Sequence, residues 1–155
     1  MRKQKNEVQM KNSRYPKRAP IKDYFPLPNE IFCIGLSYGE IAVYSYLLYR
    51  ENRKSFQCYP SYKTIGKALH MSRNTVSKYI RRLEERELIA TEPTAVHTSQ
   101  GKKLNGNLLY TILPIEQAKQ YFYNRQLKNI DQVIADRKQR KRIEKLNLKP
   151  NKEAG

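Results

Sequence analysis

The stretch HMSRNTVSKYIRRLEERELI, residues 70–89, decides the fold because it combines an apolar stripe and a basic surface in one helix length. At about 100° per residue, Val76, Ile80 and Leu83 fall within roughly 60° of one another. Polar and basic side chains occupy the other side of the same helix, and the glutamates come only after Leu83. The pattern predicts an amphipathic helix over about 73–85.

Two shorter signals predict further helices before this one. In LSYGEIAVYSYLLYREN, Ser37 stands three residues before Glu40, which is the capping-box arrangement, and the apolar spacing that follows indicates a core helix over roughly 38–52. Pro60 followed by Ser61 marks the start of a second helix in YKTIGKALH. The chain therefore enters the basic segment from a pair of helices.

The junction between the second helix and the basic helix has its own signals. His70 is expected as a left-handed C-cap, because histidine tolerates this geometry better than most residues that have a side chain. Ser72 is expected to cap the basic helix after a turn of about three residues. Gly66 weakens the second helix by up to about 1 kcal/mol unless close packing requires it.

Two strands are expected after the basic helix. LIATEP and LLYTILP are short runs that contain β-branched and aromatic residues. The polar segment TAVHTSQGKKLNGN between them is expected to be a hairpin loop that carries Lys102 and Lys103. Three helices followed by a two-stranded hairpin with a basic tip indicate a mainly α fold with a small β-hairpin wing, a winged helix-turn-helix.

Charge is concentrated at the two ends of the chain. Residues 1–22 carry eight basic and one acidic side chain, residues 23–113 carry twelve and eight, and residues 114–155 carry eleven and five. The formal net charge of +17 indicates a polyanionic partner. We expect a disordered basic arm over 1–22, the winged helix-turn-helix domain over 23–113, and a long basic C-terminal helix and tail over 114–155.

The residues that commonly carry chemistry are sparse. Cys33 and Cys58 lie far apart and are expected to be reduced core or near-core thiols, and His70 and His97 are isolated. The sequence therefore predicts no enzyme and no catalytic, cofactor-binding or metal site. The basic N-terminus has no apolar centre, and no apolar run approaches the ~18 residues of a spanning helix. We expect a cytoplasmic protein that does not contact membranes.

The segment CYPSYKTIGKALHMSRNTVSKYIRRLEERELI resembles the winged-helix domain of bacterial helix-turn-helix proteins. Such domains occur in plasmid and phage replication initiators, DnaD-like primosomal proteins and GntR-type regulators. The resemblance covers about residues 27–113 and is specific for the fold, while the proteins that share this domain differ in task. The family that this segment resembles usually has glycine just before the position of Leu88, where this chain has Glu87. The residues that carry it are Tyr59, Pro60, Ser61, Ile65, Ser72, Arg73, Thr75, Val76, Ile80, Leu83, Leu88 and Ile89.

This resemblance implies a set of DNA-facing residues on the basic helix. Arginine can pair two donors with guanine and asparagine can do the same with adenine, while hydroxyl groups serve phosphates or base edges. The helix geometry adds Arg81 and Arg82 to this face, the resemblance puts Tyr62 and Lys63 on phosphates, and Lys102 and Lys103 lie on the wing. The residues implied to face DNA directly are Ser72, Arg73, Asn74, Thr75, Ser77 and Lys78.

The C-terminal segment predicts a long helix that begins near Pro114. Its apolar residues repeat at intervals of four, three and four, which gives a narrow stripe formed by Tyr123, Leu127, Ile130 and Ile134. The stripe is expected to pair with a second copy, as dimers that read paired half-sites do, or to pack back on its own domain; the sequence favours neither. Beyond it, RKQRKR at 137–142 is either a phosphate-binding extension or a solvated helix end.

The sequence thus predicts sequence-specific binding of double-stranded DNA by a bacterial or mobile-element protein. The role is transcriptional regulation or a replication-associated task, with a bacterial nucleoid- or plasmid-associated location. The alternative is a protein-docking winged helix in a replication or partition complex, with nonspecific nucleic-acid binding through the basic arms. Loss of specific duplex binding on substitution of Arg73 and Lys78 distinguishes the two.

Overall fold

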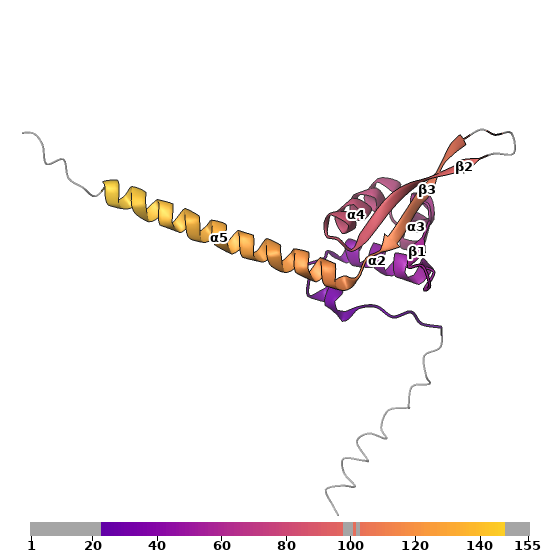
Figure 1. Cartoon of the computed structure of the whole chain (residues 1–155), viewed down its shortest axis with the longest axis horizontal. Helices are drawn as coiled ribbons and strands as arrows, with labels where there is room; N and C mark the ends of the chain where they lie inside the picture. Colours follow the sequence, from indigo (N-terminus) through magenta and orange to yellow (C-terminus); the bar gives the residue numbers. More distant parts are fainter. Residues whose placement is uncertain (1–22, 98–100, 102, 148–155) are drawn as a thin grey trace, which may run out of the picture.

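The computed structural model describes residues 23–97, 101 and 103–147. The arm predicted over 1–22 lies outside these residues. Within them, α-helices pack beside a three-stranded antiparallel sheet, and the fold class predicted from the sequence, a winged helix-turn-helix with a long C-terminal helix, is confirmed (Figure 1). The elements are the 3-10 helix η1 (Asn29–Phe32), α2 (Tyr38–Arg50), β1 (Gln57–Cys58), α3 (Tyr62–Leu69), α4 (Arg73–Glu85), β2 (Ile89–His97), β3 (Lys103–Ile112) and α5 (Ile115–Asn147).

Serine side chains cap the three helices of the domain as the sequence predicts. The Ser37 and Glu40 side chains form the complete capping box of α2. The Ser61 hydroxyl accepts from the Thr64 amide at 3.0 Å at the start of α3, and the Ser72 hydroxyl accepts from the Thr75 amide at 3.1 Å at the start of α4. Helix α2 ends at Arg50, two residues earlier than predicted.

The wing is longer than the sequence prediction, which placed residues 94–107 in a loop. Strands β2 and β3 pair from Ile89 opposite Ile112 out to His97 opposite Lys103, with a register shift between Pro93 and Ala95. The loop prediction failed because the outer part of the hairpin, which projects from the domain (Figure 1), lacks in its sequence the apolar alternation that marks a half-buried strand. Strand β1, only two residues long, pairs with β3 and was also missed.

The core lies between the three helices and the sheet. It contains the predicted stripe of α4, the inner face of α2 and residues from the two long strands. Cys58 is buried in it and its thiol lies 3.7 Å from the Leu47 carbonyl oxygen, whereas Cys33 is exposed, contrary to the expectation that both are core or near-core thiols. The fully buried side chains include Tyr44, Leu47, Ile65, Val76, Leu83, Leu88, Ile89 and Tyr110.

A buried ion pair connects the start of α2 with the end of α4. Glu40 is 1% exposed; its Oε2 accepts from the Ser37 amide at 2.7 Å, and its Oε1 lies 3.0 Å from Arg86 Nε. Burial raises the pKa of Glu40, but the hydrogen bonds with Ser37 and the charges of Arg86 and Arg82 outweigh it and hold this pKa below 4.5. Arg86 also donates to the Ile34 carbonyl oxygen. The pair therefore ties three segments together.

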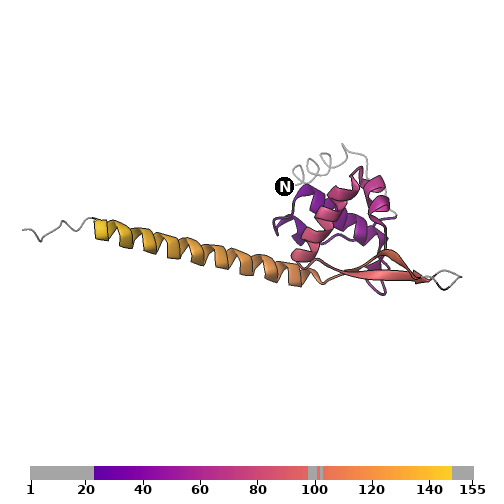
Figure 2. The same ribbon diagram turned by 90° about the horizontal axis from the view of Figure 1, so that it is seen from above.

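Only the first turns of α5 touch the domain (Figure 2). Ala118 is buried, Phe122 packs against the core, and Lys119 Nζ lies 3.9 Å from the Glu30 carboxylate. The rest of α5 leads away from the domain, so the described residues do not show the apolar stripe packing back on its own chain. None of the helices in the described ranges is both long and apolar enough to cross a membrane.

Helix α4 ends in a Schellman motif. The Leu88 amide donates to the Leu83 carbonyl oxygen and the Glu87 amide donates to the Glu84 carbonyl oxygen, both at 3.0 Å. Glu87 has a φ of 57°, the left-handed conformation that is expected from the resemblance to a family that usually has glycine at this position. A residue with a Cβ pays a conformational cost here that glycine does not.

Replacing Glu87 with glycine is expected to stabilise the domain. The Glu87→Gly variant should raise the free energy of unfolding by about 0.5–1 kcal/mol, because glycine adopts a positive φ at little cost. Urea denaturation followed by circular dichroism measures this change, with Glu85→Gly, inside the helix, as the control that should lower stability. An unchanged or lower stability of Glu87→Gly would contradict the Schellman assignment.

Glu40 is expected to contribute stability that depends on pH. The Glu40→Gln variant should unfold about 1–3 kcal/mol more readily at pH 7, since it leaves the Arg86 charge without its anion. Because the folded pKa of Glu40 lies below its ordinary value of 4.5, this contribution is complete above pH 4.5 and is lost as the pH falls through the folded pKa. Denaturation of both proteins between pH 7 and pH 3 should show the difference shrinking at acid pH; a constant difference would refute this account.

Candidate nucleic-acid interface

The turn between α3 and α4 is built by a close approach of two backbones. Residue His70 closes α3 in the left-handed conformation, with φ 54° and ψ 41°, as the sequence predicts. The Met71 amide donates to the Gly66 carbonyl oxygen at 2.9 Å, and a Cβ added to Gly66 would lie 2.5 Å from the Met71 carbonyl oxygen. Close packing therefore requires glycine at position 66. This glycine weakens α3 but permits the three-residue turn between α3 and α4.

This turn presents the outer face of α4 to solvent. Val76, Ile80 and Leu83 are buried against the core, which fixes the rotation of the helix about its axis. Of the predicted DNA-facing residues on this helix and its cap, Ser72, Arg73, Asn74, Lys78, Arg81 and Arg82 are exposed, whereas Thr75 and Ser77 are half-buried. No acidic residue interrupts the exposed side between Arg73 and Leu83.

Exposed residues of α4 line two hollows of the surface. The first lies along the middle of the helix and is lined only by its own side chains. Its positive charge comes from Lys78, Arg81 and Arg82, and Glu85 stands at its far end. Its lining residues are Asn74, Ser77, Lys78, Arg81, Arg82 and Glu85.

The second hollow is a cleft of about 240 Å³ between the first turn of α3, the start of α4 and the base of the wing. It brings together three residues that the sequence predicts to contact DNA, Tyr62, Lys63 and Arg73. Lys63 and Arg73 are exposed and Tyr62 is half-buried. Two cationic side chains thus flank a cleft that is closed on one side by a strand.

Of the two predicted wing lysines, Lys102 and Lys103, the structure describes only the second. Lys103 begins β3 and pairs with His97 near the tip of the hairpin, and Lys102 lies outside the described residues. The register of the two strands carries this tip away from the helices, as Figure 1 shows. The start of β3, at Lys103, therefore lies away from α4 (Figure 1).

Sequence reasoning missed the wing residues that complete the cleft. Gly106 and Asn107 line it opposite Lys63, and the Asn107 side-chain amide donates to the Tyr59 carbonyl oxygen at 3.2 Å. The Thr94 hydroxyl donates to the Asn107 carbonyl oxygen, which holds the register shift of the hairpin. The sequence KKLNGN reads as a turn, so nothing in it signalled that these residues belong to a strand beside Arg73.

No His, Cys, Asp or Glu side chains gather in groups of three with metal-binding geometry among the residues that the structure describes. The conspicuous charges of the surface are instead the cations of α3 and α4. Tyr110, buried behind the cleft, has a raised pKa because of its burial and the nearby Tyr62 and Cys58. The arrangement suits the binding of an anion, because its exposed groups are hydrogen-bond donors and positive charges.

Comparison with known proteins supports the assignment of the domain. Residues 35–89 match the family model described as a helix-turn-helix domain. This segment runs from the loop before α2 to the start of β2, so it contains all three helices of the domain. A search of curated proteins found no match.

Solved structures with a related arrangement have low sequence identity to this chain. A possible transcriptional regulator from Methanosarcina mazei Go1 is 20% identical, with 74% of this chain and 83% of that chain covered and a TM-score of 0.40. A mutant of S. aureus MepR bound to an oligodeoxyribonucleotide is 15% identical, with 94% and 88% covered and a TM-score of 0.42. The S. aureus MepR–DNA complex is 16% identical, with 94% and 93% covered and a TM-score of 0.35.

These structural similarities are too weak to carry an argument about mechanism. The assignment instead depends on the family match over 35–89, the three-residue turn between α3 and α4, and the antiparallel hairpin that follows α4. Together they show that the described residues contain a winged helix-turn-helix fold.

Proposed function

We propose that this protein binds double-stranded DNA in a sequence-specific manner, with α4 lying in the major groove. The observation that carries the proposal is the exposed face of α4, whose charged residues from Arg73 to Arg82 are all cationic. An α-helix fits the major groove, where each base pair presents a distinct pattern of donors and acceptors. The tasks that such binding serves are transcriptional regulation or a replication-associated function, which use the same domain.

The first turn of α4 supplies the base-reading residues in this proposal. Arg73 and Asn74 are exposed at the end of the helix that begins next to the tight turn, where recognition helices approach base edges. Arg73 has the two donors that pair with guanine, and Asn74 has the donor and acceptor that pair with adenine. The buried stripe leaves these two side chains no role in the core.

Contacts to the DNA backbone come from the elements beside α4. Lys63 lies across the cleft from the wing, at the start of α3, and positions a cation for a phosphate group. The hairpin of β2 and β3 extends the same side of the domain, with Lys102 and Lys103 proposed at its tip. The basic arms over 1–22 and 137–155 would add salt-sensitive affinity that does not depend on sequence.

Substitutions of Arg73 and Lys63 should separate base reading from backbone binding. Arg73→Ala is expected to lower affinity for the preferred duplex by about 5- to 150-fold and to relax the preference at one base position. Lys63→Ala should weaken binding to all duplexes alike and reduce the salt slope by about one. Selection from a random duplex pool, followed by fluorescence anisotropy at several salt concentrations, measures both effects.

A matched control removes one positive charge elsewhere. Lys54 is exposed in the loop after α2, so Lys54→Ala should change affinity for the selected duplex by less than about twofold. If the Arg73→Ala protein retains its sequence preference, α4 does not read the bases. A wild-type protein that selects no motif would favour the alternative of a protein-docking domain whose basic segments bind nucleic acid nonspecifically.

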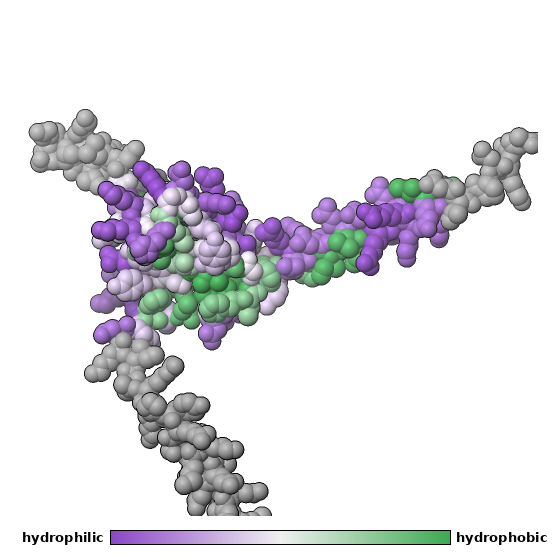
Figure 3. Space-filling view, turned by 180° about the vertical axis from the view of Figure 1, so that it is seen from behind, coloured by the Kyte–Doolittle hydropathy of each residue, from purple (hydrophilic) through white to green (hydrophobic). Residues whose placement is uncertain are grey.

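We further propose that two copies of the chain pair through α5. Tyr123, Leu127, Ile130 and Ile134 are all more than half exposed, at 57%, 60%, 54% and 58%. Figure 3 shows apolar surface at this part of the helix, followed by hydrophilic surface further along. A helix without tertiary packing gains little stability from its own hydrogen bonds. A second copy offers an identical stripe, and a twofold dimer would present two α4 helices to paired half-sites.

An aspartate in the stripe should abolish this pairing. Ile130→Asp is expected to shift the protein from dimer to monomer in sedimentation equilibrium, because it buries a charge in the apolar seam. Gln132→Asp introduces the same charge on the opposite side of α5 and should leave the dimer intact. A wild-type protein that remains monomeric at 100 µM, or dimerisation equal in both variants, would refute pairing through α5.

A further inference from the structure

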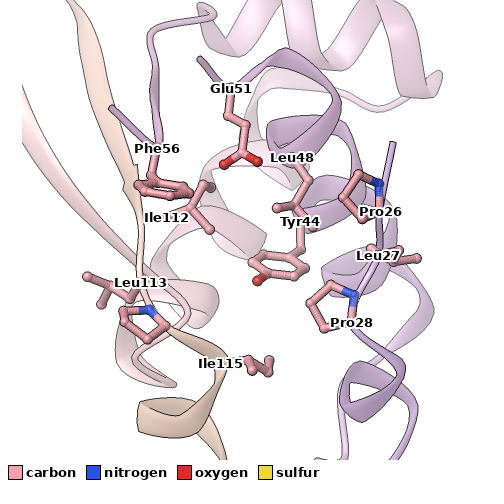
Figure 4. Close-up of a pocket in the computed structure, with 11 residues that line it drawn as sticks. Pro26, Leu27, Pro28, Tyr44, Leu48, Glu51, Phe56, Ile112, Leu113 and Ile115 are labelled. Carbon is pink, nitrogen blue, oxygen red and sulfur yellow. The ribbon is translucent and has the colours of Figure 1, made fainter. Parts of the chain in front are cut away.

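An apolar cavity lies where the domain meets α5, away from the basic face of α4. Its volume is about 560 Å³, it is open to solvent, and it is lined by the segment 26–28, the end of α2 and the connection from β3 to α5 (Figure 4). Its apolar lining includes Leu27, Leu48, Phe56 and Leu113. Small-molecule sites in proteins have volumes of this order and are mostly apolar, with a few polar groups.

One acidic side chain, Glu51, lines this cavity. It follows the last turn of α2, and Figure 4 shows its carboxylate turned inward beside the apolar side chains. The Oε2 atom is fully buried and has no hydrogen-bond partner among the described residues. A buried acceptor of this kind is costly unless something donates to it.

Among the described residues, no hydrogen-bond donor contacts Glu51 Oε2. Burial raises the pKa of Glu51, and the charge of Arg53 only partly opposes the effect. Burial and the same carboxylate raise the pKa of Tyr44 to about 12 and that of Cys58 to about 11, so the neighbouring tyrosine and thiol stay neutral. The cavity therefore combines an apolar wall with an acidic group whose Oε2 lacks a hydrogen-bond partner among the described residues.

We propose that this cavity binds a small organic molecule that has an apolar, aromatic body and a primary ammonium group. The ammonium would donate a hydrogen bond to the Glu51 carboxylate and place a positive charge beside it. The aromatic body would lie among Leu27, Leu48 and Leu113. A primary ammonium fits better than a quaternary one, because the buried oxygen requires an N–H donor.

This proposal does not depend on DNA binding, so either can fail without the other. The cavity shares no lining residue with the cleft beside Arg73 or with the hollow along α4. Binding is therefore measured on the full chain without DNA.

Three probes of one shape test the chemistry of the site. Isothermal titration calorimetry at 150 mM salt uses 4-phenylbutylamine, the neutral 4-phenylbutan-1-ol and the anionic 4-phenylbutyrate. The amine should bind saturably and about tenfold or more tighter than the alcohol, and the butyrate should show no binding. Absence of saturable binding by the amine, or equal affinity for amine and alcohol, would overturn the proposal.

Two variants locate the site. Glu51→Gln keeps the shape of the side chain and should reduce the affinity for the amine to that for the alcohol. As the control, Glu85→Gln changes an exposed residue of α4 and should leave the affinities for the amine and the alcohol unchanged. Leu113→Trp should fill the cavity and block the amine. Thermal melting confirms that each variant folds. If a folded Glu51→Gln protein binds the amine as tightly as the wild type, Glu51 does not hold the ammonium and the assignment is wrong.

Discussion

The contact between Gly66 and the Met71 carbonyl oxygen is the constraint on which the candidate interface depends. At this point the backbone of α3 touches the turn that follows it, and a side chain of any size would force the two apart. Because the turn is short, the first residues of α3 and α4 lie beside the same strand, and Lys63 and Arg73 line one cleft. The geometry of the surface thus follows from the absence of a Cβ at a buried position.

The other end of α4 is held by different chemistry. Glu40 pairs with Arg86 at the C-terminal cap, and the ring of Tyr79 lies directly against Gly39 on α2. With one end fixed by backbone packing and the other by a buried ion pair, the helix cannot rotate without losing its apolar contacts. Arg86 follows directly on the basic helix but pairs with Glu40 inside the fold, whereas the arginines and lysine between residues 73 and 82 remain exposed.

The sequence predicted the helices well because their signals are local. Serine caps, an apolar stripe and the left-handed positions of His70 and Glu87 depend on residues within one or two turns. The length of the wing depends on pairing between residues 89–97 and 103–112, whose outer positions carry no apolar alternation in the sequence. For the same reason the sequence identified Arg73 and Lys63 as candidates but missed Asn107, which reaches them only through strand register.

The connection from β3 to α5 was predicted as a helix start and has a larger role in the structure. Ile112 pairs with Ile89 at the end of the sheet, Leu113 donates its amide to the Leu88 carbonyl oxygen, and Ile115 begins α5. These three residues also line the apolar cavity. Because α5 contacts the domain only through its first turns, the side chains that line the cavity also set the direction in which α5 leaves the domain. The exposed stripe of α5 is therefore positioned by side chains around the cavity rather than by contacts of its own.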